Sequence, residues 1–295
     1  MPTIYFPNLG LEFNINSIAF EVFGLPIYWY GIILTSGIIL GLLMGIYIAK
    51  KEGLDPEIIL DFLLIDIVFA VLGARLYFVA FNWPYYKENL GEILNIRQGG
   101  IAIYGAILAS FIVAVVYTRK KKINLWQFGD IAAYSLLIGQ ALGRYGNFVN
   151  QEAFGDYTNG LFAMQLGKEQ ALKHINQATI DQFVAIQPEN IINKGGLEYI
   201  QVHPTFFYES TWNIGLLILL LIFYKYKKQH GEIFFMYVAG YGLGRFWVEG
   251  LRTDQLIVPI IEIPASQIVA ICSILIGMIG LIWCRKRRKE VLKFR

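Results

Sequence analysis

The sequence predicts an all-α membrane protein with seven transmembrane helices. Of its 295 residues, 56% are hydrophobic and only 16% are charged, whereas about 25% of the residues in soluble domains are charged. Long apolar runs recur along the chain with no Pro- or Ser-rich linker between them, and Lys and Arg gather at alternate ends of these runs. We therefore expect one membrane domain over residues 1–295.

Seven apolar stretches are long enough for helices that cross a bilayer, which needs about 20 residues each. They cover roughly residues 27–49, 57–81, 99–117, 126–150, 205–224, 231–249 and 263–284. No Lys or Arg precedes Lys50. Sixteen of the 25 Lys and Arg fall in segments predicted inside, six in those predicted outside and three within spans. By the positive-inside rule, the N-terminus should lie outside and the C-terminus inside.

One long segment, residues 151–204, interrupts the spans between the fourth and the fifth. It should lie outside as a small head or arm, too short to build a core of its own. Residues 171–183 have helical potential, and Asn193-Lys-Gly-Gly196 is typical of a turn.

The N-terminus and the two cysteines exclude some further features. The first residues lack a basic region, and no Ala-x-Ala site follows an apolar run, so no cleavable signal peptide is expected. Cys272 and Cys284 lie in one apolar run, where a helix would separate them by about 18 Å. They therefore predict neither a disulfide with each other nor a metal framework.

Three arginines lie within the predicted spans: Arg75, Arg144 and Arg245. Each follows a Leu-Gly or Leu-Gly-Ala phrase in the outer half of a helix that runs from inside to outside. A guanidinium at membrane depth costs about 2.5 to 3.5 kcal/mol, so it usually has a partner. One such arginine could extend to the interface. Three at equivalent places favour an anionic group held near the outer leaflet.

The fourth span ends in the stretch around which the chain is organised, residues 143–155. Gln140, Arg144, Asn147 and Gln151 follow each other at i, i+4, i+7 and i+11, which places them on one helix face. A polar face with a buried cation suits an anionic head group, although a lone arginine at a helix end with polar cap residues would have the same pattern.

The sixth span places polar groups on both sides of its arginine. Tyr241, Arg245 and Glu249 are four residues apart, so a phenol and a carboxylate can orient the guanidinium. A simple helix pair between Arg245 and Glu249 is the structural alternative, and it can coexist with a functional role. Arg252 follows on the loop.

Further polar residues also lie near the outer ends of spans. Tyr30 opens the first span, Tyr104 lies one turn into the third, and His203 and Glu209 flank the start of the fifth. Tyr30 alone is typical of an aromatic belt at the interface, and His203 alone would be a solvated or capping histidine.

Together these motifs resemble those of bacterial prolipoprotein diacylglyceryl transferases. Residues 143–155 read Gly-Arg-Tyr-Gly-Asn-Phe-Val-Asn-Gln-Glu-Ala-Phe-Gly and match the family signature Gly-Arg-x-Gly-Asn-Phe-x-Asn-x-Glu-x-x-Gly. His203-Pro-Thr-x-x-Tyr-Glu209 and Tyr241-Gly-x-x-Arg-Phe-x-x-Glu-x-x-Arg252 follow in the family's order, and Tyr30-Gly31 and Gly99-Gly100 also correspond. The resemblance covers essentially the whole chain.

The resemblance implies a definite reaction in the cytoplasmic membrane of a bacterium, with the active site towards the outer leaflet. The diacylglyceryl group of phosphatidylglycerol passes to the thiol of the lipobox cysteine in a prolipoprotein signal peptide, which leaves a thioether and glycerol phosphate. This is the first step of lipoprotein maturation. It implies membrane lipids as surroundings and no metal, cofactor or nucleic acid.

The resemblance also implies roles for individual residues. Arg144 would bind the phosphatidylglycerol head group, and Arg245 would be a second essential cation. The other substrate-binding candidates are Tyr30, Asn147, Asn150, Glu152, Gly155, Glu209, Tyr241, Glu249 and Arg252.

The base that deprotonates the thiol stays open. A thiol with a pKa near 8.5 needs a base or a nearby cation to form the thiolate. Many family members have a histidine where this chain has Tyr104, and a phenol with a pKa near 10 is a poorer base. Tyr104, His203 or no dedicated base would serve, and we prefer His203 or none. The catalytic candidates are thus Arg144, Arg245, Tyr104 and His203.

A lipid or solute transporter with an anion site near the outer leaflet is the alternative from another class. Transporters often contain inverted repeats with sites at the midplane, whereas the Leu-Gly phrases here lie on parallel helices near one side. A non-catalytic receptor would leave the arginines unexplained. The sequence therefore favours the transferase.

Overall fold

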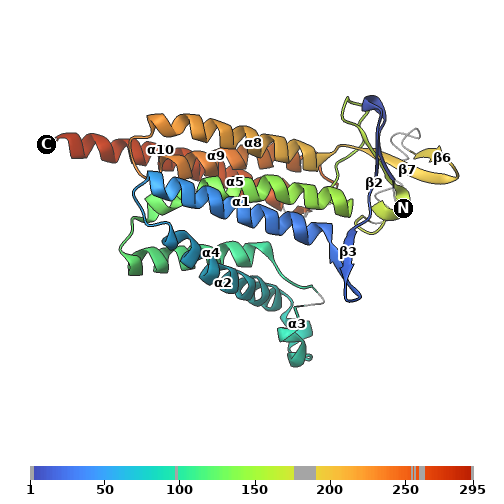
Figure 1. Cartoon of the computed structure of the whole chain (residues 1–295), viewed down its shortest axis with the longest axis horizontal. Helices are drawn as coiled ribbons and strands as arrows, with labels where there is room; N and C mark the ends of the chain where they lie inside the picture. Colours follow the sequence, from blue (N-terminus) through green and yellow to red (C-terminus); the bar gives the residue numbers. More distant parts are fainter. Residues whose placement is uncertain are drawn as a thin grey trace. The chain divides into compact units, whose positions relative to one another are not determined.

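The computed structural model describes residues 3–96, 99–175, 191–253, 255, 257–258 and 263–293, with side chains up to Lys286. It is mainly helical, with three small antiparallel sheets (Figure 1). The chain forms two compact units, residues 1–41 with 133–295 and residues 42–132. The single membrane domain expected from the sequence stays a prediction.

The first unit contains five long helices, of which two continue into the second unit. They are α1 (Trp29–Lys51), α5 (Leu125–Asn150), α8 (Thr205–Phe223), α9 (Glu232–Glu249) and α10 (Ala265–Lys293). Helices α5, α8 and α9 lie side by side (Figure 1). The hydroxyl of Tyr134 on α5 donates to the carbonyl oxygen of Leu220 on α8 at 3.2 Å, and Nε1 of Trp212 on α8 donates to the carbonyl oxygen of Gly240 on α9 at 2.9 Å.

A helix occupies each of the seven predicted spans. Among the described residues, four helices are long and apolar enough to cross a membrane: Trp29–Lys51, Ile103–Lys121, Thr205–Tyr226 and Ala265–Lys286. The other three predicted spans correspond to α2 (Glu57–Phe81), α5 and α9. The chain is therefore an integral membrane protein with at least four candidate spans, and the seven-span topology stays a prediction.

Helices α1 and α4 (Ile103–Lys121) extend beyond the apolar runs into the basic residues at their C-terminal ends. Lys and Arg are good helix formers, and a cation in the last turn interacts favourably with the helix dipole. The expected boundaries, which stopped at the last apolar residue, are therefore too short there.

The expectation of an all-α fold is wrong at the head, which contains a five-stranded sheet. Its strands follow the order β2 (Leu11–Asn14), β1 (Thr3–Phe6), β5 (Met164–Gly167), β7 (Leu197–Val202) and β6 (Ile191–Lys194). All neighbours are antiparallel, and Tyr5 of β1 pairs with Gln165 of β5. The N-terminal segment thus completes a sheet that the head segment begins.

The head has a core because the N-terminal strands contribute to it. Alternate residues of three strands face inward, as a period of two requires, and they pack with side chains from the adjoining loops and helices. The core residues are Ile4, Phe6, Phe154, Met164, Leu166, Ala171, Ile175, Ile200, Val202 and Phe206. Residues 151–204 therefore share a core with the N-terminus.

The remaining head expectations have mixed outcomes. A turn joins β6 and β7 at Gly195 and Gly196, as predicted. The helix expected over residues 171–183 is instead the short α6 (Lys168–Ala171), and residues 176–183 lie outside the described part. Two further hairpins pair β3 (Ile18–Val22) with β4 (Leu25–Tyr28) and β8 (Ile257–Val258) with β9 (Ile263–Pro264).

The second unit is built on the packing of α2 against α4. A Cβ added at Gly73 would lie 2.8 Å from the carbonyl oxygen of Gly105, and one at Gly105 would lie 2.4 Å from that of Gly73. The helix backbones approach this closely because both positions are glycine. A short helix, α3 (Trp83–Tyr86), and a 3-10 turn, η2 (Leu90–Leu94), connect the two long helices.

Candidate active site

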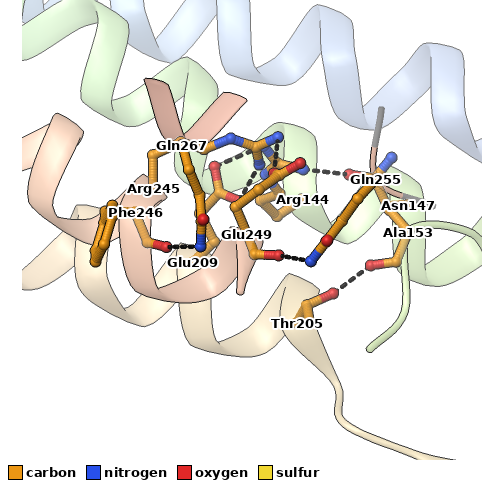
Figure 2. Close-up of polar contacts among 10 residues, drawn as sticks. All are labelled: Arg144, Asn147, Ala153, Thr205, Glu209, Arg245, Phe246, Glu249, Gln255 and Gln267. Carbon is orange, nitrogen blue, oxygen red and sulfur yellow. Dashed lines mark hydrogen bonds and ion pairs between the residues drawn. The ribbon is translucent and has the colours of Figure 1, made fainter. Parts of the chain in front are cut away.

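Two arginines from different helices share one buried carboxylate (Figure 2). Nη2 of Arg144 lies 2.5 Å from Oε1 of Glu209, and Nη1 of Arg245 lies 3.0 Å from Oε2 of the same carboxylate. Nη2 of Arg245 also lies 2.6 Å from Oε2 of Glu249. The Glu209 side chain is 2% exposed, and those of Arg144 and Arg245 are 19% and 18% exposed. Each buried charge is thus paired, as burial requires.

This cluster forms because three helix ends meet. Arg144 lies in the last two turns of α5, Glu209 in the first two turns of α8, and Arg245 and Glu249 in the last two turns of α9. Since α8 runs antiparallel to both neighbours, its start lies beside their ends. The sequence motifs that contain these residues are far apart in the chain and converge for this reason.

A chain of amides extends the network from Arg144 towards the head. Nη1 of Arg144 donates to Oδ1 of Asn147 at 3.3 Å, and Nδ2 of Asn147 donates to Oε1 of Glu152 at 2.8 Å. Nδ2 of Asn150 lies 3.4 Å from the same Oε1. Three of the substrate-binding candidates named from the sequence therefore lie in one network with Arg144.

Gly155 joins the three loops that leave these helix ends. Its N–H donates to the carbonyl oxygen of His203 at 2.9 Å, and it forms an isolated antiparallel bridge with Arg252. A Cβ at this position would lie 2.7 Å from the carbonyl oxygen of Leu251 and 2.8 Å from Cβ of His203. No side chain fits there, which explains the glycine at the end of the 143–155 stretch.

His203 lies at the same loop junction, with Nδ1 3.2 Å from the hydroxyl of Tyr208. Burial lowers the pKa of His203, and the nearby carboxylate of Asp156 opposes this shift. The imidazole is therefore neutral at pH 7 and can accept a proton. Its hydrogen bonds do not run to Arg144 or Arg245 in the described part of the chain.

Three tyrosines named from the sequence have different surroundings. Tyr241 stacks on Tyr237 with ring centroids 5.9 Å apart and is hydrogen-bonded to Arg144 as well as near Arg245. Tyr30 packs on α5, since a Cβ at Gly146 would lie 2.7 Å from its Cδ2. Tyr104 belongs to α4 in the second unit and is 42% exposed.

A cavity of about 590 Å³ lies beside the amide chain in the first unit. Tyr30 and Asn150 line it, together with Gln151 and two basic residues of the head, Lys173 and His174. The sequence did not identify the basic pair, because it lies in a segment of mixed composition with no motif. In the part of the chain that the structure describes, no group of His, Cys, Asp or Glu could hold a metal ion.

The interpretation that all three arginines hold one anionic group is wrong for Arg75. Its guanidinium donates five hydrogen bonds to backbone carbonyl oxygens. Nε bonds to Ile93 at 2.8 Å, and Nη1 bonds to Gly99 at 3.1 Å and to Gly100 at 2.6 Å. Nη2 bonds to Glu92 at 2.6 Å and to Asn95 at 3.0 Å. The residue is 7% exposed. All five donors of a guanidinium are thus used to hold the loop before α4.

Comparisons with known proteins agree with these motifs. A family model described as prolipoprotein diacylglyceryl transferase matches residues 17–283. The phosphatidylglycerol–prolipoprotein diacylglyceryl transferase of Lysinibacillus sphaericus (strain C3-41) is 40% identical over 286 residues, which are 96% of this chain and 97% of the relative. The transferase of Bacillus cereus (strain B4264) is 39% identical over 273 residues, which are 92% of this chain and 93% of the relative. That of Bacillus mycoides (strain KBAB4) is 38% identical over 278 residues, which are 94% of this chain and 95% of the relative.

Proposed function

The chain belongs to the prolipoprotein diacylglyceryl transferase family, and we propose that Arg144 and Arg245 hold the phosphate of phosphatidylglycerol during the transfer. The chain is accordingly a membrane-bound transferase that acts in lipoprotein maturation. The observation that carries the proposal is the pair of guanidinium groups that converge on Glu209 from two helices.

The reaction replaces a carbon–oxygen bond by a carbon–sulfur bond. The thiolate of a prolipoprotein lipobox cysteine attacks the glyceryl carbon that carries the phosphate oxygen, the thioether forms, and glycerol phosphate leaves with the electron pair. The phosphodiester carries one negative charge and the departing phosphomonoester approaches two. Cations on the phosphate oxygens therefore stabilise the transition state more than the ground state.

Glu209 orients both guanidinium groups before the lipid binds. It uses one nitrogen of Arg144 and one of Arg245, and a guanidinium has five N–H donors in a planar fork. Because both arginine side chains remain partly exposed, their other donors can bind phosphate oxygens. A cation pair that is already oriented needs no reorganisation during the reaction.

We propose that the imidazole of His203 accepts the proton of the thiol. Burial keeps its imidazole neutral, and when Nδ1 carries the proton that the Tyr208 hydroxyl accepts, Nε2 is free to accept another. Tyr104 would serve only if a neighbouring cation lowered its pKa.

We further propose seven membrane-spanning helices, with the N-terminus outside, the C-terminus inside and the site towards the outer leaflet of the bacterial cytoplasmic membrane. Basic residues close the last turns of α1 and α4, which supports an inside location for those ends. The arginines of α5 and α9 are both paired with Glu209, which supports a position of these helices in a bilayer.

The test follows glycerol phosphate release from phosphatidylglycerol and a lipobox peptide by the purified protein in detergent. We expect Arg144→Ala to lower the rate by about 100-fold or more, as does loss of a donor to a developing oxyanion. The matched control Arg119→Ala, an exposed arginine in the last turn of α4, should leave the rate unchanged, and a peptide with Ser in place of Cys should give no release. Undiminished release by Arg144→Ala would refute the assignment.

A further inference from the structure

A second polar layer lies one helical turn from the arginine cluster, on the same three helices. Gln140 precedes Arg144 by four residues on α5, and Asn213 follows Glu209 by four on α8. Four residues advance a helix by one turn. Since α5 and α8 are antiparallel, both displacements point away from the head. The layer therefore lies further from the head than the arginine cluster does.

The contacts on either side place Gln140 and Asn213 at a similar level along α5 and α8. Helices α5 and α8 touch through Arg144 and Glu209 at one level and through Tyr134 and Leu220 further along. These two contacts are ten residues apart on α5 and eleven on α8, so the register changes little between them. Nε2 of Gln140 also donates to the hydroxyl of Tyr237 on α9 at 2.8 Å, which orients the amide.

The layer extends back to Ser210, which directly follows Glu209, and it contains buried polar atoms that no described residue satisfies. Ser210 and Asn213 are both 0% exposed, and the Ser210 hydroxyl, both amide atoms of Asn213 and Oε1 of Gln140 have no hydrogen-bond partner within the described part of the chain. Buried polar groups are nearly always paired. Two of these four atoms, the Ser210 hydroxyl and Nδ2 of Asn213, are donors, and they indicate a bound acceptor that the protein alone does not supply.

The layer is suited to a neutral acceptor. Asn213 and Ser210 are three residues apart and so share a helix face, and both can donate hydrogen bonds. None of the three side chains carries a charge. An anion would be drawn to the arginines one turn away, whereas an uncharged carbonyl oxygen needs only donors of this kind.

We propose that the Ser210 hydroxyl and Nδ2 of Asn213 donate hydrogen bonds to the ester carbonyl groups of the diacylglyceryl moiety. The proposal rests on the phosphate lying at Arg144 and Arg245. One helical turn is about 5.4 Å, and the polar head-group and interfacial region is about 5 to 7 Å thick on each side of a bilayer. A lipid whose phosphate contacts the arginines therefore places its esters at the depth of this layer.

The consequence is a second level of substrate recognition. The arginines recognise the phosphate, which all anionic phospholipids share. The neutral layer recognises the ester linkage of the part that is transferred, and it fixes the glyceryl carbon between the two levels. Ser210 and Asn213 would thus determine specificity for diacyl over dialkyl lipids.

The experiment compares phosphatidylglycerol with two ester-linked chains and its diether analogue of the same chain length. At subsaturating lipid, we expect the native protein to release glycerol phosphate from the diester about 5 to 10 times faster. Asn213→Leu should lower the diester rate by a similar factor and leave the diether rate nearly unchanged, so the ratio approaches one. Thr211→Val, an exposed neighbour on the same helix, should keep the native ratio.

The diether rate reports folding within each variant, because that lipid lacks the carbonyl groups. An unchanged diester-to-diether ratio in Asn213→Leu, or an equal fall for both lipids, would overturn the subsite and leave Asn213 a structural residue or one that holds trapped water. If Asn213→Leu does not fold, the smaller change Ser210→Ala decides by the same ratio. If Arg144→Ala left release intact, the phosphate site would fail while the ratio still tested the ester subsite.

Discussion

Two regions of the molecule place an arginine after a Leu-Gly phrase and use it in different ways. In the second unit, all five N–H donors of Arg75 are hydrogen-bonded to carbonyl oxygens of one loop. In the first unit, Arg144 and Arg245 share the carboxylate of Glu209 and keep part of their surface exposed. The local sequence is similar, but the partners differ in kind.

The difference separates a structural arginine from one that can bind a ligand. Backbone carbonyl oxygens are fixed by the fold, so a guanidinium that satisfies five of them has no donor left for a ligand. A carboxylate takes only one nitrogen from each of two arginines and leaves donors available. Donor use, rather than depth in the helix, thus distinguishes the two cases.

The largest expected effect on stability is at the structural arginine. Arg75→Met would deprive five carbonyl oxygens of a charged donor. Because some of these groups can take water instead, we expect a loss of about 2 to 4 kcal/mol, measured by denaturation in detergent. Hydrogen exchange should locate the change in residues 92–100.

Arg144→Met is the matched comparison, since Glu209 keeps its contact with Arg245 in that variant. It should lose less stability than Arg75→Met and more activity. Equal stability losses in both variants would break the distinction between the two regions.

An intermediate effect is expected at the glycines that bring backbone close to each site. A Cβ at Gly100 would lie 2.4 Å from Nη1 of Arg75 with φ at +73°, and one at Gly155 would lie 2.7 Å from a backbone oxygen. Each alanine variant should cost about 1 to 3 kcal/mol through overpacking, measured by thermal denaturation. Only Gly155→Ala should also reduce the affinity for phosphatidylglycerol, because it displaces the loops around the cluster.

Gly215→Ala on α8 serves as the control for both changes, because a Cβ there meets no atom within 4 Å. If Gly100→Ala weakened lipid binding as much as Gly155→Ala, the two regions would not be functionally separate.

The smallest expected effect is the pH dependence contributed by His203. Its folded-state pKa lies below the value of about 6.5 in the unfolded chain. Between these two values the unfolded state binds more protons, so the free energy of unfolding rises with pH and falls as the pH drops below about 6.5. His203→Gln should remove this component of the stability curve.

The same variant tests the assignment of the thiol proton. We expect His203→Gln to lower glycerol phosphate release and to remove the acidic limb of the pH profile, while Tyr104→Phe changes it little. Full activity in His203→Gln with none in Tyr104→Phe would transfer the role to Tyr104.

The sequence predicted the parts of the fold that depend on local pattern. Apolar runs of about 20 residues located all seven helices, since length and composition suffice for that. The strands of the head have four to six residues, and β1 pairs with β5 far along the chain. Such short, non-local pairings have no periodicity long enough to be recognised.

The site was predictable as a set of residues but not as a set of contacts. Motifs identified Arg144, Glu209 and Arg245, yet the sharing of one carboxylate depends on how α8 packs against both α5 and α9. Arg75 was misinterpreted because backbone carbonyl oxygens are acceptors in every sequence and mark no position. Ser210 and Asn213 are identified by their burial and by polar atoms that have no hydrogen-bond partner among the described residues, and neither property can be read from the sequence.

The head sheet imposes an order on the synthesis of the protein. The strand with Thr3–Phe6 is made first, yet its partner Met164–Gly167 emerges after α1, α2, α4 and α5. Only β2 can pair with the N-terminal strand during that time, so the edge that faces β5 stays open while these four helices are made. A chaperone or a second chain can bind this exposed edge in the meantime. A fusion at the N-terminus would hinder the last step of folding, in which β1 pairs with β5.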